Sequence, residues 1–272
     1  MPFTTAEDGT RVYFEKHGDG PAVLFVHGSG GHHAAWWQQV AALRDRYTVI
    51  TVDLRGFGLS DSSMEEFDAR AFPSDILAVI EAAQAGRVLL VGQSIGAAAA
   101  LKAAIARPES AAGVVLAHSL GGIDHPELAR LVAADREAAT RLPVLDRLLS
   151  ARFRDEHPDL TFLFRQMGTF NTAKMADLRN LNADGPTVEQ VVASGIAVFF
   201  LAGELDAVLS VATVERAARV VTGSHLDVVA GAPHSMYWEA PEKFNSAVER
   251  VLRRVHERDP ETMTDTDGPV RV

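Results

Sequence analysis

The stretch Val88-Leu-Leu-Val-Gly92-Gln-Ser94-Ile-Gly96-Ala-Ala-Ala-Ala100 decides the fold of this chain. Its first four residues are apolar and rich in valine and leucine, which is typical of a strand buried on both faces. The alanines after Gly96 predict a helix that ends at Arg107-Pro108, because a proline disfavours helical backbone in the residue before it. Strand and helix follow each other without a loop, so the backbone at Ser94 must bend sharply.

Gly92 and Gly96 lie two residues to either side of Ser94, where a β-carbon would collide across the bend. Such a bend raises the serine hydroxyl at the carboxyl end of the strand, above the amino terminus of the helix. The pattern is the G-x-S-x-G nucleophile elbow, with Gln93 and Ile95 at its variable positions. The same five residues also fit a glycine-flanked turn that caps a helix. The strand before them and the small-residue helix after them favour a nucleophilic serine.

The rest of the chain alternates strands and helices around this elbow. Further strands are predicted at 11–17, 22–26, 47–52, 113–118, 196–202 and 226–229, with a short first strand before the turn at Asp8-Gly9. Helices are predicted around Trp36, from Pro73, at 214–221 and from Pro241. This alternation predicts an α/β fold with a mostly parallel central sheet and helices on both faces.

One long segment interrupts the alternation. From about His125 to Val192 the sequence is helical and lacks strands. We therefore predict an α/β core of residues 1–120 and 193–257, interrupted by a helical cap of residues 121–192. Residues 258–272 are polar and lack periodicity, so we expect a disordered tail there.

Length, net charge and cysteine content exclude several kinds of binding partner and active site. With 272 residues, of which 47% are hydrophobic, the chain can build a substantial core. A net charge of -10 argues against nucleic acid or an anionic membrane surface as a partner. There is no cysteine, which excludes disulfides, thiol nucleophiles and cysteine zinc sites. No signal peptide or apolar run of membrane-spanning length is apparent. We expect a cytoplasmic protein that acts on a small molecule, without a cofactor, a metal or membrane insertion. The sequence does not determine its oligomeric state.

A serine at neutral pH needs a base within hydrogen-bond reach. His234 is the candidate base, because the loop 230–235 leaves the last strand at the same sheet edge as the elbow. His118, at the end of the strand after the elbow, is its main competitor. Most other histidines have ordinary explanations as turn, edge or surface residues.

The base in turn needs a carboxylate that holds its tautomer. Asp206 leaves the penultimate strand at the same edge and is the candidate acid. Glu204 and Asp124 are the alternatives. The order Ser94, Asp206, His234 matches the Ser…Asp…His order of one hydrolase class.

Acyl transfer also requires hydrogen-bond donors for the developing oxyanion. The amide of Ile95 supplies one at the amino end of its helix. The second is expected from the loop His27-Gly-Ser-Gly-Gly31, from the amide of Ser29 first and of Gly30 next. A phosphate-binding loop is a poor alternative, because neither G-K-[ST] nor G-x-G-x-x-G occurs.

At these motifs the chain resembles the α/β-hydrolase superfamily, and the resemblance covers nearly everything up to about Glu257. It is carried by the elbow and by four segments, His27–Gly31, Asp53–Ser60, Gly203–Asp206 and Pro233–Asn245. The resemblance implies that the helical insertion is a cap over the active site and that Asp53–Ser60 is structural. Many relatives have glycine where this chain has Pro233, a difference that leaves the base in place.

The reaction stays open, because this fold supports many chemistries. Dehalogenases and epoxide hydrolases of this fold use aspartate, so Ser94 disfavours them. We expect a carboxylic ester hydrolase, acting on an ester, thioester or lactone of a small, largely apolar substrate through an acyl-enzyme. Two alternatives are hydrolysis of a carbon–carbon bond, with Arg165, Lys174 or Arg179 binding a carboxylate, and a slow-turnover binding or signalling protein.

Specificity is expected from the cap and from side chains near the oxyanion loop. The segment 162–167 has more apolar bulk than a two-sided helix needs for packing on the core, although packing explains most such residues. The predicted pocket residues are Trp36, Trp37, His118, Phe162, Phe164, Met167 and Phe170.

Overall fold

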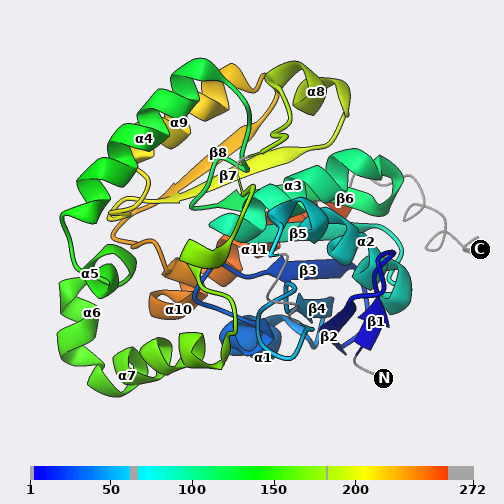
Figure 1. Ribbon diagram of the computed structural model, residues 1–272, viewed down its shortest axis with the longest axis horizontal. Coiled ribbons are helices and arrows are strands. Elements are labelled where there is room, and N and C mark those ends of the chain that lie inside the picture. The colour runs from blue at the N-terminus through cyan, green and yellow to red at the C-terminus, as the bar shows by residue number, and fades with distance from the viewer. Residues whose placement is uncertain (1–2, 62–66, 182, 257–272) are drawn as a thin grey trace, which may run out of the picture.

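The computed structural model describes residues 3–61, 67–181 and 183–256. Within them the chain forms an eight-stranded sheet with helices on both faces (Figure 1). The strands are β1 (Phe3–Thr5), β2 (Arg11–His17), β3 (Ala22–Val26), β4 (Thr48–Val52), β5 (Val88–Gln93), β6 (Ala111–Ala117), β7 (Val198–Gly203) and β8 (His225–Val229). Their order is β1-β2-β4-β3-β5-β6-β7-β8. β2 pairs antiparallel with β1 and β4, and all pairings from β4 to β8 are parallel, which confirms the predicted sheet.

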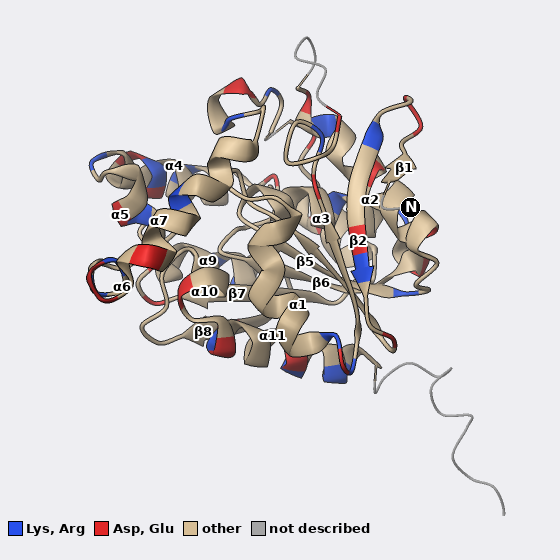
Figure 2. Cartoon of the chain, turned by 90° about the horizontal axis from the view of Figure 1, so that it is seen from below, with Lys and Arg blue, Asp and Glu red and all other residues tan. Residues whose placement is uncertain are grey.

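The strands at the centre of the sheet are buried on both faces. Every residue of β3, β4, β5 and β7 is buried, as their continuous apolar sequences indicate. One face packs against α2 (Phe72–Ala83), α3 (Ile95–Ala106) and α9 (Val211–Val220). The other packs against α1 (Trp37–Leu43), α10 (Met236–Glu239) and α11 (Pro241–His256). Figure 2 shows acidic and basic residues on the outer elements, whereas β5, β6 and β7 have none.

Helix α3 follows the elbow directly. Its burial explains why its sequence is rich in alanine. Its residues from Ile95 to Leu101 are buried, and it contacts β5, β6, β3 and α2. A helix enclosed on several sides needs small side chains, because bulkier ones would hold it away from the sheet. The elbow is therefore set where a buried strand passes directly into a buried helix.

The chain between β6 and β7 forms the helical insertion, which comprises α4 (Pro126–Thr140), α5 (Val144–Leu148), α6 (Ala151–Glu156), α7 (Pro158–Met167) and α8 (Val188–Ala193). In Figure 1 the helices α4 to α7 form an arc along one side of the sheet. The described insertion contains no strand, in agreement with the strandless pattern of its sequence. The division into core and cap stays a prediction. The tail predicted for 258–272 lies outside the described residues.

In the part of the chain that the structure describes, no helix is both long and apolar enough to cross a membrane.

Candidate active site

The backbone at Ser94 adopts the bend that the elbow sequence predicts. Its φ is 53° and its ψ is -116°, a conformation that L-residues rarely adopt. A β-carbon on Gly92 would lie 2.4 Å from the Cα of Ala97, across the bend. A β-carbon on Gly96 would instead meet the carbonyl oxygen of Val26 at 2.4 Å. One glycine thus permits the bend itself, and the other permits the close approach of the helix to β3.

Asp206 and His234 form a buried pair at the same edge of the sheet. His234 Nδ1 lies 3.0 Å from Oδ1 and 2.9 Å from Oδ2 of the Asp206 carboxylate. Burial alone would raise the pKa of Asp206, but the charge of the His234 imidazole and hydrogen bonds from two histidines lower it well below its usual range. The backbone amides of Val208 and Leu209 also donate to Oδ1, at 2.7 and 3.0 Å. Asp206 is therefore an ionised carboxylate with a fixed orientation.

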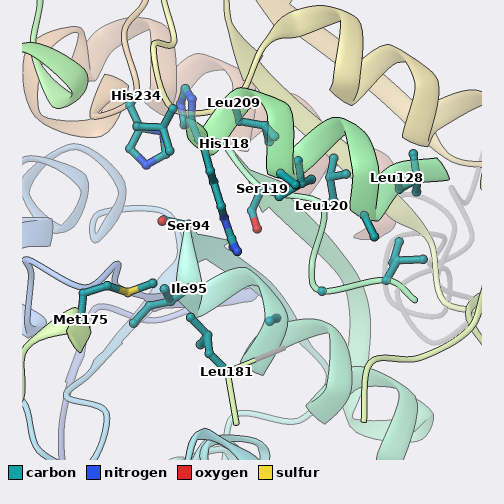
Figure 3. Close-up of a pocket in the computed structure, with 18 of the residues that line it drawn as sticks. Ser94, Ile95, His118, Ser119, Leu120, Leu128, Met175, Leu181, Leu209 and His234 are labelled. Atoms are coloured by element: carbon teal, nitrogen blue, oxygen red, sulfur yellow. The ribbon is translucent and has the colours of Figure 1, made fainter. Parts of the chain in front are cut away.

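His234 faces the nucleophile. In Figure 3 its imidazole lies over Ser94 and points a ring nitrogen toward the serine hydroxyl. The same two residues line both cavities described below. Gln93 Nε2 donates to the carbonyl oxygen of His234 at 3.3 Å, which ties the histidine loop to the elbow. The three residues predicted to act together, Ser94, Asp206 and His234, are thus brought to one place.

The alternative acids and base have other partners. Glu204 accepts a hydrogen bond from the amide of Gly231, and Asp124 lines a cavity from the insertion side. Among the described residues, neither carboxylate has a hydrogen bond to an imidazole. His118 Nδ1 lies 2.9 Å from Asp206 Oδ2, and its side chain has no exposed surface. His118 is therefore a second partner of the acid, and its enclosed ring is poorly placed to serve as the base.

The loop His27–Gly31, predicted to supply an oxyanion donor and called the oxyanion loop below, is a tight turn beside Ser94. The amide of Gly31 donates to the carbonyl of Gly28 at 3.1 Å, which leaves Ser29 and Gly30 at the centre of the turn. A β-carbon on Gly28 would lie 3.3 Å from Ser94 Cβ and 2.1 Å from Gln93 Oε1. Ile95 is the first residue of α3, so its N–H has no carbonyl partner within the helix. Ile95 lines the first of the two cavities at Ser94 described below, and Ser29 and Gly30 line the second.

Several buried polar side chains hold the oxyanion loop in place. The amide of Leu54 donates to His27 Nε2 at 3.0 Å, so His27 Nδ1 carries the proton that is donated to Gly28 O at 2.8 Å. Asn171 Nδ2, from the part of the insertion that follows α7, donates to Gly31 O at 3.1 Å. The fully buried Asp53 accepts from the amide and Nδ1 of His33.

These supporting roles have weak signals in the sequence. The Asp53–Ser60 segment could have indicated such support, since family resemblance already marks it as structural. Gln93 and Asn171 have no pattern around them that predicts their contacts, because each acts across more than 100 residues of chain.

Two cavities meet at Ser94 and His234. The first cavity, of about 330 Å³, is lined on the insertion side by residues of α4 (Figure 3). The second cavity, of about 540 Å³, lies between the oxyanion loop and helices α5 and α7. Lining residues include Ile95, His118, Ser119, Asp124, Leu128, Val132, Arg136, Met175 and Leu209 for the first, and Gly28–Gly31, Val144, Leu148, Phe164, Arg165 and Tyr237 for the second.

The structure places the seven predicted pocket residues in three different settings. Phe164 lines the second cavity and His118 the first. Trp36 and Met167 are buried in the core, and Trp36 packs on Phe25, Tyr237 and Phe244. Trp37, Phe162 and Phe170 are exposed by 48%, 63% and 68%.

The pocket roles predicted for five of these residues are therefore corrected. The pattern of apolar residues identifies large side chains but not the direction in which each leaves its helix. Trp36 and Met167 fill the core beneath the site. Trp37, Phe162 and Phe170 line neither cavity and face outward.

Two groups of side chains bring three possible metal-ligand atoms within 4.8 Å of one another: His32, His33 and Asp53, and His118, Asp206 and His234. In both groups the carboxylate already accepts hydrogen bonds from imidazole and backbone N–H groups. A metal ion would have to displace these donors. The contacts of both groups are those of hydrogen-bonded networks.

Comparison with known proteins places the chain in a family. The model of the alpha/beta hydrolase family matches residues 23–247. Similar proteins include 3-oxoadipate enol-lactonase 2 of Acinetobacter baylyi, 26% identical with 87% of this chain and 90% of that one covered. 2-(Acetamidomethylene)succinate hydrolase of Mesorhizobium japonicum is 27% identical with the same coverage. A solved thermophilic esterase from Thermogutta terrifontis superposes with a TM-score of 0.78 at 28% identity, over 93% of this chain and 97% of that one.

The family match spans both the elbow and the histidine loop, and the sheet order and helices agree with it. The chain is a hydrolase that belongs to the alpha/beta hydrolase family.

Proposed function

We propose that this protein is a serine hydrolase that cleaves a carboxylic ester, thioester or lactone of a small, largely apolar substrate through an acyl-enzyme. One observation carries the proposal. Ser94, held in the elbow, lies beneath His234, which is held by the ionised Asp206, where two cavities meet. A nucleophile, a base and an orienting carboxylate in this arrangement are the requirements of acyl transfer.

The reaction follows from these positions. His234 takes the proton of the Ser94 hydroxyl as Oγ attacks the substrate carbonyl, and the carbonyl oxygen becomes an oxyanion. The amides of Ile95 and of Ser29, or Gly30 next to it, donate to that oxygen. Collapse of the intermediate breaks the ester bond, and His234 gives its proton to the leaving alcohol. Water then attacks the acyl-enzyme with His234 as base, which releases a carboxylic acid and restores Ser94.

The insertion supplies the walls of both cavities in this proposal and acts as a cap. Leu128 and Val132 of α4 line the first cavity, and Leu148 and Phe164 of α5 and α7 line the second. Two cavities that share the nucleophile suit a substrate with one group on each side of the scissile bond. Mostly apolar linings favour small apolar groups in both.

A second candidate reaction is hydrolysis of a carbon–carbon bond next to a carbonyl group. One observation favours it, because Arg165 lines the second cavity and has no ion-pair partner among the described residues. This arginine could bind a substrate carboxylate. Lys174 and Arg179 line neither cavity.

The test is a panel of p-nitrophenyl esters of increasing chain length, a lactone, a thioester and a 1,5-diketone acid. We expect ester or lactone turnover that falls roughly 10⁴-fold or more in Ser94→Ala. Ser119→Ala is the matched control, since this serine lines the same cavity and should keep its activity. Turnover of the diketone alone would favour the second reaction. Saturable binding of a ligand with no turnover would contradict both and indicate a binding protein.

A further inference from the structure

Asp206 has two histidine partners, whereas orienting one base requires only one. His118 Nδ1 and His234 Nδ1 each lie 2.9 Å from the same oxygen, Oδ2. The two rings meet edge to face with centroids 5.5 Å apart. The side chains of His118, Asp206 and His234 are 0%, 1% and 4% exposed, so little water reaches the group.

The hydrogen bonds determine the tautomer of His118. An ionised carboxylate only accepts hydrogen bonds, so the Nδ1 of His118 must carry a proton and donate it to Asp206. Its Nε2 is buried and has no partner among the described residues. Protonation would leave an N–H there without an acceptor, and burial accordingly lowers the pKa of His118 although Asp206 opposes the shift. His118 is thus a neutral donor to the acid.

The backbone holds His118 in an unusual conformation. Its φ is 55°, in the left-handed region that only a few per cent of non-glycine residues adopt, histidine among the more frequent of them. The amide of His118 donates to Leu201 O at 2.8 Å. The carbonyl of the preceding residue, Ala117, accepts a hydrogen bond from the amide of Ser94 at 3.0 Å. The neighbouring Gly203 leaves the room that the ring needs, since a β-carbon there would lie 3.0 Å from His118 Cε1. The fold therefore holds His118 in an uncommon backbone conformation in which its side chain meets the acid.

We propose that His118 is a positioning residue that acts through Asp206 and weakens the hold of Asp206 on the proton of His234. The inference rests on the proposed function. The His118 donor shares the charge of Oδ2, so the carboxylate stabilises the imidazolium of His234 less than it would alone. The neutral form of His234, which is the form that acts as a base, is favoured by this arrangement. The donor also fixes the carboxylate in the orientation that His234 needs.

Few other charges act on this group. Asp206 comes from the loop after β7 and His234 from the loop after β8, and they are the titratable groups that face His118 directly. Asp124 and Arg136 line the first cavity from the insertion side and are its remaining charged residues in the described chain. A change of pH dependence on replacing His118 would therefore report on Asp206 and His234.

The kinetic test compares two replacements of His118, by asparagine and by leucine, whose side chains are similar in shape. The amide nitrogen of asparagine can take the place of Nδ1, whereas leucine offers no donor. In His118→Leu we expect the acid limb of the kcat/KM profile to move to higher pH by on the order of one unit. Turnover on that limb then falls about tenfold relative to the unmodified protein. His118→Asn should keep the limb in place, and so should His157→Leu, which replaces an exposed histidine that lines neither cavity.

An unmoved limb in an active His118→Leu variant, or equal shifts in both variants, would overturn the inference. Loss of the proposed function would look different, because the unmodified protein would then show no hydrolysis that depends on Ser94. Should the leucine variant fail to fold, nitrogen NMR of the unmodified protein decides, with His118→Asn used to assign the signals. We expect a protonated Nδ1 and a bare Nε2 on a neutral His118 at neutral pH. The opposite tautomer, or an imidazolium at neutral pH, would overturn the inference.

Discussion

The carboxyl edge of the sheet and the helical insertion fix their side chains in different ways. At the edge, Asp206 is held by two imidazoles and two backbone amides, and the oxyanion loop is held by His27 and Asn171. In the insertion, the cavity walls are apolar side chains such as Leu128 and Phe164, which are placed by packing.

Under the proposed function, this contrast assigns reactivity and specificity to separate parts of the molecule. The directional contacts of the edge determine which atoms react, and a lost donor or acceptor there is costly. The packing of the insertion determines which groups fit, and it tolerates exchange of one apolar side chain for another. Substitutions in the two regions should therefore differ in kind as well as in size.

The largest effect is expected from Asp206→Asn. An asparagine can present an N–H toward His234 Nδ1, which holds the base in the wrong tautomer. We expect kcat to fall roughly 10⁴-fold with little change in KM. The measurement is steady-state kinetics on the preferred ester of the panel.

Asp124→Asn is the matched control, since Asp124 also lines the first cavity but lies on the insertion side. It should leave kcat close to that of the unmodified protein. Greater damage from Asp124→Asn than from Asp206→Asn would remove Asp206 from its role and break the proposed division.

A smaller effect concerns stability and His27. Burial lowers the pKa of His27 to about 4, and its neutral ring accepts from Leu54 and donates to Gly28. Because the folded pKa lies below the ordinary value near 6.5, the contribution is complete above pH 6.5 and is lost as the pH falls through 4. The free energy of unfolding should drop by roughly 3 kcal/mol across that window.

Urea unfolding at several pH values measures this slope. His27→Gln keeps an acceptor for Leu54 without a titrating group, so its stability should change less between pH 6.5 and 4. His157→Gln, at an exposed position of the insertion, should retain the slope of the unmodified protein. Equal slopes in all three proteins would contradict the assignment of a neutral, hydrogen-bonded His27.

The smallest effect should appear in the insertion. Phe164 lines the second cavity and packs edge to face on Trp238 with centroids 5.4 Å apart, whereas Phe162 is 63% exposed two residues earlier. Phe164→Ala should change the preference between short and long esters by about 1–3 kcal/mol, with little loss toward a small activated ester. Phe162→Ala should leave the profile unchanged. A shift in both variants, or in neither, would mean that another surface selects the substrate.

The sequence predicts the sheet and the edge well because their signals are local. Continuous apolar strands mark β3, β5 and β7, and the loop after each parallel strand necessarily emerges at one edge. That rule alone brings Ser94, Asp206 and His234 together. Hydrogen bonds between distant segments, such as those of Gln93 and Asn171, leave no periodic signal.

The insertion is less predictable for a physical reason. Apolar residues on its short helices serve core packing, cavity lining and outward exposure, and all three uses give similar patterns. Met167 and Phe164 lie on the same helix, yet Met167 is buried in the core and Phe164 lines a cavity. His118, at the edge of the sheet, is also predicted only in part. Its position after β6 predicts that it lies near the site, but not that it donates a hydrogen bond to Asp206.

In the proposed function, Ser94 attacks the substrate and forms a covalent acyl-enzyme. The most direct measurement is mass spectrometry of the protein after reaction with an alkyl p-nitrophenyl phosphonate, followed by peptide mapping. We expect one adduct per chain, on Ser94, formed more slowly in Asp206→Asn and absent in Ser94→Ala. An adduct on Ser119, Ser235 or any other residue, or an unmodified Ser94 in an active preparation, would contradict it.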